Sequence, residues 1–160
     1  MNIKLQKSGF GMLELVVGVS VLSIALFSIA ASVQLAMKAA QQNTDSIKAN
    51  FLIEEGLEAV KTMRDRGWTN NISTLASGTN YYLRYNNAKW ATTTANVLID
   101  GIFERKFILT GVYRDVNGNI ASSGAADDGT KKITVYISWR NKNSTTTEQM
   151  SAYIANLFKN

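Results

Sequence analysis

The sequence contains no cysteine, no histidine and no proline. Without cysteine the chain forms no disulfide and offers no thiolate nucleophile. Without histidine it has neither a Ser-His-Asp triad nor the Cys/His ligands of a zinc site. Charged residues make up only 18% of the chain, and 17 basic against 12 acidic side chains leave a formal charge of +5. This excess is smaller than that of dedicated nucleic-acid-binding arms, so nucleic acid is not an expected partner.

The chain does contain one long apolar segment. No charged residue occurs in residues 15–37, and Gln34 is the first strongly polar side chain near their end. As a helix the segment is about 34 Å long, compared with a hydrocarbon core of about 30 Å. A helix buried in a soluble domain would normally carry a polar stripe, and this one has none before Gln34. The segment therefore predicts a helix that inserts into a membrane.

Two ordinary interpretations of such a segment remain open. Lys4 and Lys7 precede it, and Ser28-Ile29-Ala30 has the small residues of a signal-peptidase site, which are features of a cleaved secretory signal. The apolar run from Leu15 to Ala30 is, however, slightly longer than the usual signal core of about 7–15 residues. A plain single-pass anchor is the other interpretation. With either kind of segment, the chain would be a secreted or membrane-anchored β-rich domain that binds a ligand or nucleic acid.

Glu14 stands directly before the apolar run, where a carboxylate is costly and usually marks a function. The surrounding stretch, KSGFGMLE at residues 7–14, resembles the cleavage and methylation motif of type IV prepilins. In that family a basic leader ends in Gly, the next residue is usually Phe, and Glu is the fifth mature residue. Here these are Gly9, Phe10 and Glu14. The resemblance covers about residues 7–35.

The resemblance implies that a membrane prepilin peptidase cleaves between Gly9 and Phe10 and N-methylates the new terminus. It implies a structural filament subunit without catalysis of its own, either a minor pilin or a pseudopilin. The Glu14 carboxylate would pair with the Phe10 amine of a neighbouring subunit. The other partners would be the lipid bilayer, further pilin subunits and an inner-membrane assembly platform. The protein would first span the inner membrane once and then enter a periplasmic or cell-surface filament.

Small residues recur every seven positions in the segment, at Gly11, Gly18, Ala25 and Ser32. Positions seven apart fall on one slowly drifting stripe of a helix, which would allow close helix packing. Many pilins carry a proline in this segment, and this chain has none. We therefore expect a straighter helix, or melting on assembly that begins at Gly18 or in residues 43–46.

The rest of the sequence has the apolar patterns of an α+β domain: helical spacing comes first, and strand-like alternation follows. Residues 39–66 predict the second, amphipathic half of the long helix, and Gly67 is the stop signal that follows it. Its apolar face is predicted to contain Ala49, Leu52, Ile53, Gly56, Leu57, Ala59, Val60 and Met63. The opposite face carries Glu54, Glu55, Glu58, Lys61, Thr62 and Asp65, which we interpret as a solvated surface and not as catalytic carboxylates.

The strands are predicted beyond a variable loop region at residues 67–100, which holds one or two short strands near 81–85. In residues 102–114, Phe103, Phe107, Leu109 and Tyr113 should share one face. In residues 132–140, one face of the strand should likewise be shared by Ile133, Val135, Ile137 and Trp139. A turn at residues 141–144 leads to a third strand over 146–157. The expected fold is pilin-like: a leader at 1–9, a membrane half at 10–38 and a globular domain at 39–160. In that domain an antiparallel sheet over 101–160 packs on the helix.

Two further sites are weaker hypotheses. Asp115, Asn117 and Asn119 have the alternating oxygen ligands of a calcium loop, with Asp127-Asp128 nearby, but the loop lacks the usual glycine and glutamate. Asn117-Gly118 is better explained as a hairpin turn. Arg84 and Lys89 lie among Trp68, Tyr81, Tyr82, Tyr85 and Trp90 and offer a nucleic-acid stacking surface. We favour the interpretation in which these aromatic residues cover the helix and the sheet edge.

Overall fold

The computed structural model describes residues 11–141 and 144–158, so Gly9 and Phe10 lie outside the described residues. The chain divides into two compact units, Met1–Asp45 and Ser46–Asn160. Helix α1 (Met12–Asp65) begins in the first unit and ends in the second. It remains helical through Gly18 and through residues 43–46, the two places where the sequence allowed a break. No proline interrupts it, so its backbone hydrogen bonds continue through both places.

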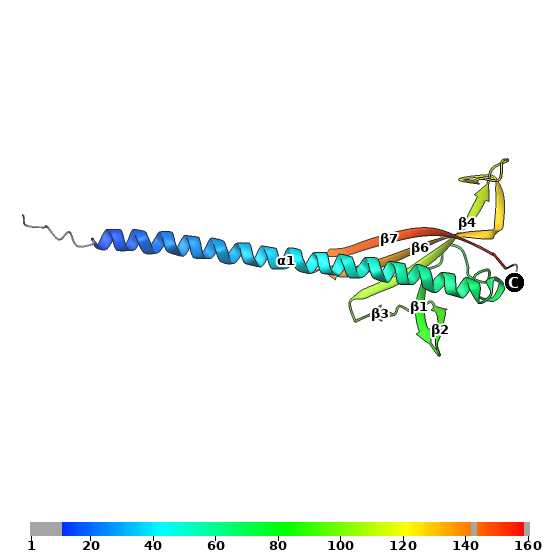
Figure 1. Cartoon of the computed structure of the whole chain (residues 1–160), viewed down its shortest axis with the longest axis horizontal. Coiled ribbons are helices and arrows are strands. Elements are labelled where there is room, and N and C mark those ends of the chain that lie inside the picture. Colours follow the sequence, from blue (N-terminus) through cyan, green and yellow to red (C-terminus); the bar gives the residue numbers. More distant parts are fainter. Residues whose placement is uncertain (1–10, 142–143, 159–160) are drawn as a thin grey trace, which may run out of the picture. The chain divides into compact units, whose positions relative to one another are not determined.

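The Ser46–Asn160 unit is an α+β domain with one seven-stranded antiparallel sheet (Figure 1). After α1 come the short helix α2 (Trp68–Asn71), β1 (Tyr81–Asn86), β2 (Lys89–Thr93) and β3 (Leu98–Ile99). The sheet continues with β4 (Phe103–Arg114), β5 (Ile120–Ala121), β6 (Ala125–Asn141) and β7 (Ser144–Ala155). The strand order is β2-β1-β4-β6-β7, and the short strands β3 and β5 also pair with β4.

The apolar face of the second half of α1 is as the sequence predicts. All eight residues assigned to that face are buried, from Ala49 to Met63. They form one core with the inward side chains of the sheet, including Phe107, Val135 and Ile137. Gly56 lies where the helix approaches the sheet closely, since an added Cβ would lie 3.0 Å from Val135 Cγ1. The glycine therefore permits the close contact between helix and sheet.

The predicted inward face of β6 is also confirmed, with Ile133, Val135, Ile137 and Trp139 all buried. The prediction for Tyr113 on β4 is wrong. The pairing of β4 with β6 shifts between Gly111 and Val112, so that Val112 opposes Asp127 while Gly111 opposes Lys131. This shift reverses the alternation, burying Val112 and leaving Tyr113 44% exposed.

The loop region at residues 67–100 contains more regular structure than the sequence indicates. The segment predicted near 81–85 is β1, and it forms a hairpin with β2 through Asn87 and Ala88. Both turn residues have positive φ, 50° and 57°, as a tight hairpin turn requires. The final strand, β7, ends at Ala155 and not at residue 157. Its pairing with β6 begins at Asn141 and Ser144, which matches the predicted turn position.

Candidate functional site

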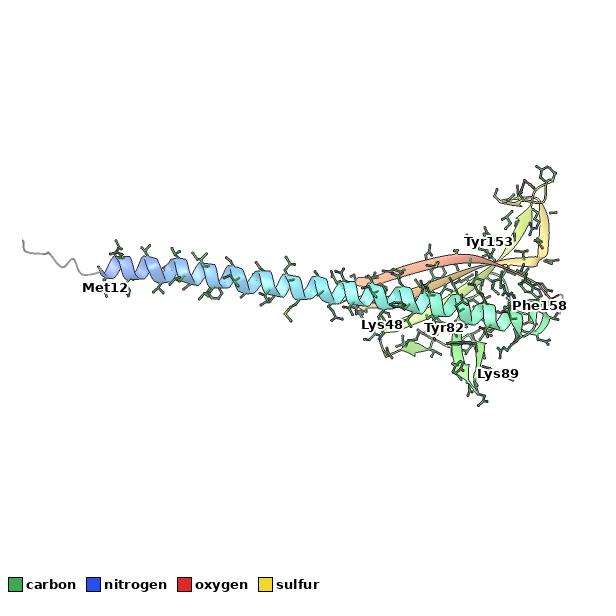
Figure 2. The ribbon with its side chains drawn as sticks, in the orientation of Figure 1. Met12, Lys48, Tyr82, Lys89, Tyr153 and Phe158 are labelled. Atoms are coloured by element: carbon green, nitrogen blue, oxygen red, sulfur yellow. The ribbon has the colours of Figure 1, made fainter. Side chains whose placement is uncertain are left out.

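The first candidate site is the apolar part of α1. Its large apolar side chains from Met12 to Met37 are all exposed in the described part of the chain, and they are visible as sticks along the helix in Figure 2. By length and composition α1 is able to cross a membrane. An exposed apolar surface of this extent is typical of a surface that contacts a membrane or another protein.

The serine hydroxyls of this segment are satisfied within the helix itself. Ser20, Ser23, Ser28 and Ser32 each donate a hydrogen bond to the backbone carbonyl four residues earlier, at 2.7–2.9 Å. A hydroxyl without a partner in hydrocarbon would cost about 4–8 kcal/mol. Because these four are already bonded, they add little to the cost of placing the helix in an apolar environment.

Glu14 lies in the first turn of α1. The backbone amides of Glu14 and Leu15 donate to the carbonyl of Gly11, at 3.0 and 3.2 Å, and so begin the helix. A carboxylate at this end is stabilised by the positive pole of the helix dipole. Its side chain is exposed and accepts no hydrogen bond from another residue within 11–141 or 144–158. The carboxylate is therefore free to pair with a cation from outside the chain.

The predicted stripe of small residues lies on α1, with Gly11 directly before the first helical residue. A Cβ added at Gly11 or Gly18 would meet no atom within 4 Å. Ala25 and Ser32 are exposed as well. Within the described part of the chain these glycines are therefore not needed for packing, and their role in packing between helices remains a prediction.

Sequence analysis missed a buried cation in the second unit. Arg105 of β4 points inward with its side chain only 5% exposed, and its Nη1 lies 2.9 Å from Glu55 Oε2 of α1. The same nitrogen donates to the carbonyl of Leu52 at 3.3 Å, and the guanidinium lies 5.3 Å from the ring centre of Trp90. Its Nε is buried without a hydrogen-bond partner among the described residues. The position of Arg105 between Phe103 and Phe107 in an alternating strand was the available signal.

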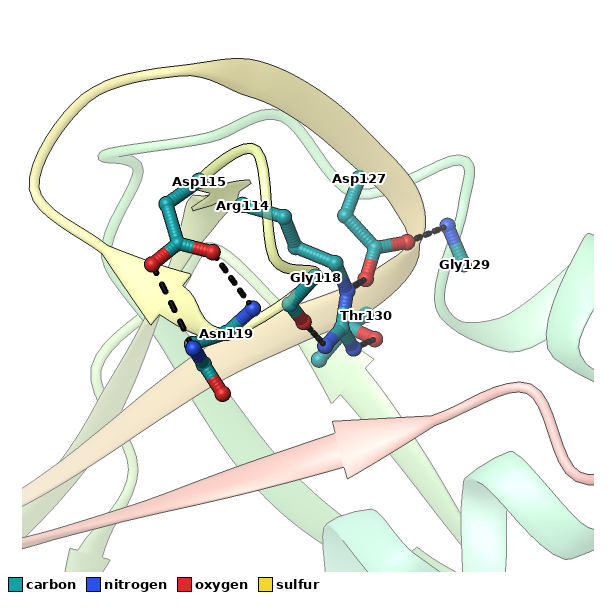
Figure 3. A network of polar contacts seen from close by, with 7 residues as sticks. All are labelled: Arg114, Asp115, Gly118, Asn119, Asp127, Gly129 and Thr130. Carbon is teal, nitrogen blue, oxygen red and sulfur yellow. Dashed lines mark hydrogen bonds and ion pairs between the residues drawn. The ribbon is translucent and has the colours of Figure 1, made fainter.

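The proposed calcium ligands form a hairpin turn between β4 and β5 (Figure 3). Asp115 Oδ1 accepts hydrogen bonds from the backbone amides of Asn117 and Asn119, at 2.9 and 2.8 Å. Oδ2 faces the Asn119 side-chain amide at 3.4 Å. The backbone bond to Asn119 is the largest cause that lowers the pKa of Asp115. The turn thus explains the aspartate and asparagines without a metal, and calcium stays a hypothesis for solution tests.

The second acidic residue near this turn, Asp127, belongs to a network around Arg114 (Figure 3). Arg114 donates through Nε to Asp127 Oδ2 at 2.6 Å, through Nη1 to the carbonyl of Gly118 at 2.7 Å and through Nη2 to Thr130 Oγ1 at 3.4 Å. The hydrogen bond with Thr130, followed by that with Arg114, lowers the pKa of Asp127. The network ties the β4–β5 turn to β6.

The aromatic residues at 68–90 are divided between core and surface. Trp68 is buried in the core, and the partly buried Tyr81 and Trp90 pack against that core. Tyr85 is exposed and touches Trp90 edge to face, with ring centres 5.0 Å apart. Most of this group therefore covers the helix and sheet, as favoured from the sequence.

Comparison of the chain with models of known protein families, with curated proteins and with solved structures found no match.

Proposed function

We propose that this chain is a structural subunit, a minor pilin or pseudopilin, of a filament related to type IV pili or to the type II secretion pseudopilus. One observation carries the proposal. A single helix exposes an uncharged apolar surface directly after Glu14, and farther along it packs on an antiparallel sheet. The prepilin-like motif at residues 7–14 supports the same assignment.

In this proposal the peptidase cuts after Gly9 and leaves the apolar part of α1 in the mature chain. The new amine of Phe10 and the carboxylate of Glu14 are then both placed in an apolar environment. Opposite charges attract strongly at low dielectric, and an unpaired buried charge is costly. Pairing between Glu14 of one subunit and Phe10 of the next would therefore set the axial register of the filament.

The proposed location follows from the same steps. Before assembly the subunit spans the inner membrane once, with the apolar part of α1 in the bilayer. The assembly platform then transfers it into a periplasmic or surface filament, where neighbouring helices replace the lipid. The internally bonded serines favour this transfer, since the hydroxyls need no water in either environment.

Intact-mass analysis of the protein from cells that contain the peptidase tests the processing step. We expect a mature terminus at Phe10 with one added methyl group. A terminus near Ala31 would support a secreted binding domain, and an intact Met1 a plain anchor; either result refutes the proposal.

The proposed role of Glu14 is tested by Glu14→Ala, with Glu54→Ala on the exposed face of the same helix as the control. Glu14→Ala should be inserted and processed normally but enter sheared filaments poorly. Glu54→Ala should assemble like the natural protein. Normal assembly of Glu14→Ala would remove the proposed register role.

The small-residue stripe is tested by comparing Gly18→Leu with Val17→Leu. Both changes add apolar volume to an exposed position of α1. If helices pack closely at Gly18, Gly18→Leu should reduce assembly more than Val17→Leu. Equal effects would mean that the spacing arose by chance.

A further inference from the structure

A cleft of about 530 Å³ opens in the Ser46–Asn160 unit, between the end of α1, helix α2 and the β1–β2 hairpin. Its volume is typical of small-molecule sites, which span about 300–1,000 Å³. Polar side chains dominate its lining, above all two cations and four carboxamides: Arg66, Lys89, Asn70, Asn71, Asn86 and Asn87. Met63, Leu75 and Trp90 supply an apolar wall.

The cleft is positively charged. No acidic residue lines it, and neither Arg66 nor Lys89 forms an ion pair within the described ranges. The acidic neighbour in sequence, Asp65, is bonded to Arg64 at 2.8 Å. Two cations that share a cleft without a counter-charge favour an anionic ligand.

One of the two cations is held in place by the hairpin. Arg66 Nη2 donates a hydrogen bond to the backbone carbonyl of Trp90, which fixes the guanidinium at the cleft. A guanidinium has five N–H donors, so several remain for a ligand, and their geometry suits a carboxylate. Lys89, labelled in Figure 2, is exposed at the start of β2 and provides the second cation.

The asparagine side chains indicate which other groups an anionic ligand of this cleft would carry. Asn71 Nδ2 donates to the carbonyl of Gly67 at 2.9 Å, so this side chain is already oriented. Asn86 and Asn87 come from the hairpin on the other side, where Asn87 adopts a φ of 50°. Each carboxamide offers both donors and acceptors, which is what the hydroxyl groups of a sugar require.

We propose that this cleft binds an acidic saccharide, with Arg66 and Lys89 bonded to its carboxylate and the asparagines to its hydroxyls. This site lies outside the apolar segment of α1 and does not depend on the proposed filament role. It would give the globular unit a ligand-binding function in addition to assembly.

Titration calorimetry with the full chain in a detergent without a sugar headgroup tests the proposal. The probes are digalacturonate, its neutral methyl ester, and glutarate, which has carboxylates but no hydroxyls. A charge-assisted hydrogen bond contributes about 1.5–3 kcal/mol, so the methyl ester should bind at least about tenfold more weakly. Glutarate should also bind at least tenfold more weakly if the hydroxyls matter.

Lys89→Gln tests the contribution of the cleft's exposed cation, because Lys89 is exposed and its loss should not disturb folding. Lys132→Gln on β6 removes the same charge away from the cleft. We expect Lys89→Gln to weaken digalacturonate binding about fivefold or more and Lys132→Gln to leave it unchanged. Equal effects of the two variants, equal binding of glutarate, or no binding at millimolar digalacturonate would each overturn the proposal.

Discussion

Removing Glu55 should destabilise the globular unit much more than removing its neighbour Glu54. Glu55 supplies the carboxylate bonded to the buried Arg105, at 2.9 Å, whereas Glu54 is exposed on the same helix. Replacement of either by alanine changes the net charge and the helix propensity by the same amount. The difference between Glu55→Ala and Glu54→Ala therefore isolates the effect on Arg105.

The size of the effect follows from the burial of the two partners. Leaving a fully buried charge without its partner costs about 3–5 kcal/mol, and an exposed pair contributes about 0–1 kcal/mol. Arg105 is 5% exposed but Glu55 is 48% exposed, so water replaces part of the lost interaction. We expect a loss of about 2 kcal/mol for Glu55→Ala, which for a unit of this size lowers Tm by about 8 °C.

Tryptophan fluorescence of the full chain in micelles measures this loss. All three tryptophans, Trp68, Trp90 and Trp139, lie in the Ser46–Asn160 unit, so the signal reports its unfolding. Arg105→Met should cost less than about 1.5 kcal/mol, because it removes the buried charge itself. Equal stability of the Glu55→Ala and Glu54→Ala proteins would refute the reasoning.

Three further predictions concern the hairpins. Ala88→Gly should raise stability by about 0.5 kcal/mol in urea unfolding, because Ala88 has a φ of 57°, whereas the control Ala91→Gly in β2 should lower it. Asp127 has a lowered pKa, so its stabilising contribution is present above the ordinary value of 3.8 and is lost as the pH falls below it. In the Asp127→Asn protein, Tm should therefore decrease less as the pH is lowered. The Asp128→Asn protein should behave like the natural one, because Asp128 is fully exposed. Millimolar calcium should leave Tm unchanged, since Asp115 already accepts backbone hydrogen bonds; a clear rise would contradict the turn interpretation.

The sequence was most informative where one face of an element is buried throughout. The spacing of apolar residues in α1 predicts its inner face completely, because helix geometry alone determines which positions meet the sheet. The same is true of β6 from Ile133 to Trp139. The alternation failed at Tyr113, because a register shift depends on how β4 pairs with a distant strand and leaves no mark in the local pattern.

The candidate sites depend even more on tertiary structure. Arg105 and Glu55 are fifty residues apart in the sequence, and only the packing of helix on sheet brings them together. The cleft likewise combines Arg66 with Lys89 through the position of the β1–β2 hairpin. The proposed role of Glu14, in contrast, rests on its sequence neighbours and not on the fold.

The register shift at Gly111 and Val112 has a consequence for how this domain tolerates change. Residues 128–130 have no backbone pairing partner on β4, so the pairing of residues 103–111 of β4 is separated from that of the outer tip, residues 112–127. Thr130 is nonetheless held in place, because it pairs with Ala155 of β7 and accepts a hydrogen bond from Arg114. Because the two stretches of pairing are separate, we expect a residue gained or lost in the tip to leave Phe107 and Leu109 facing the core. Related chains should therefore differ in the length of this tip far more freely than in any other part of β4 or β6.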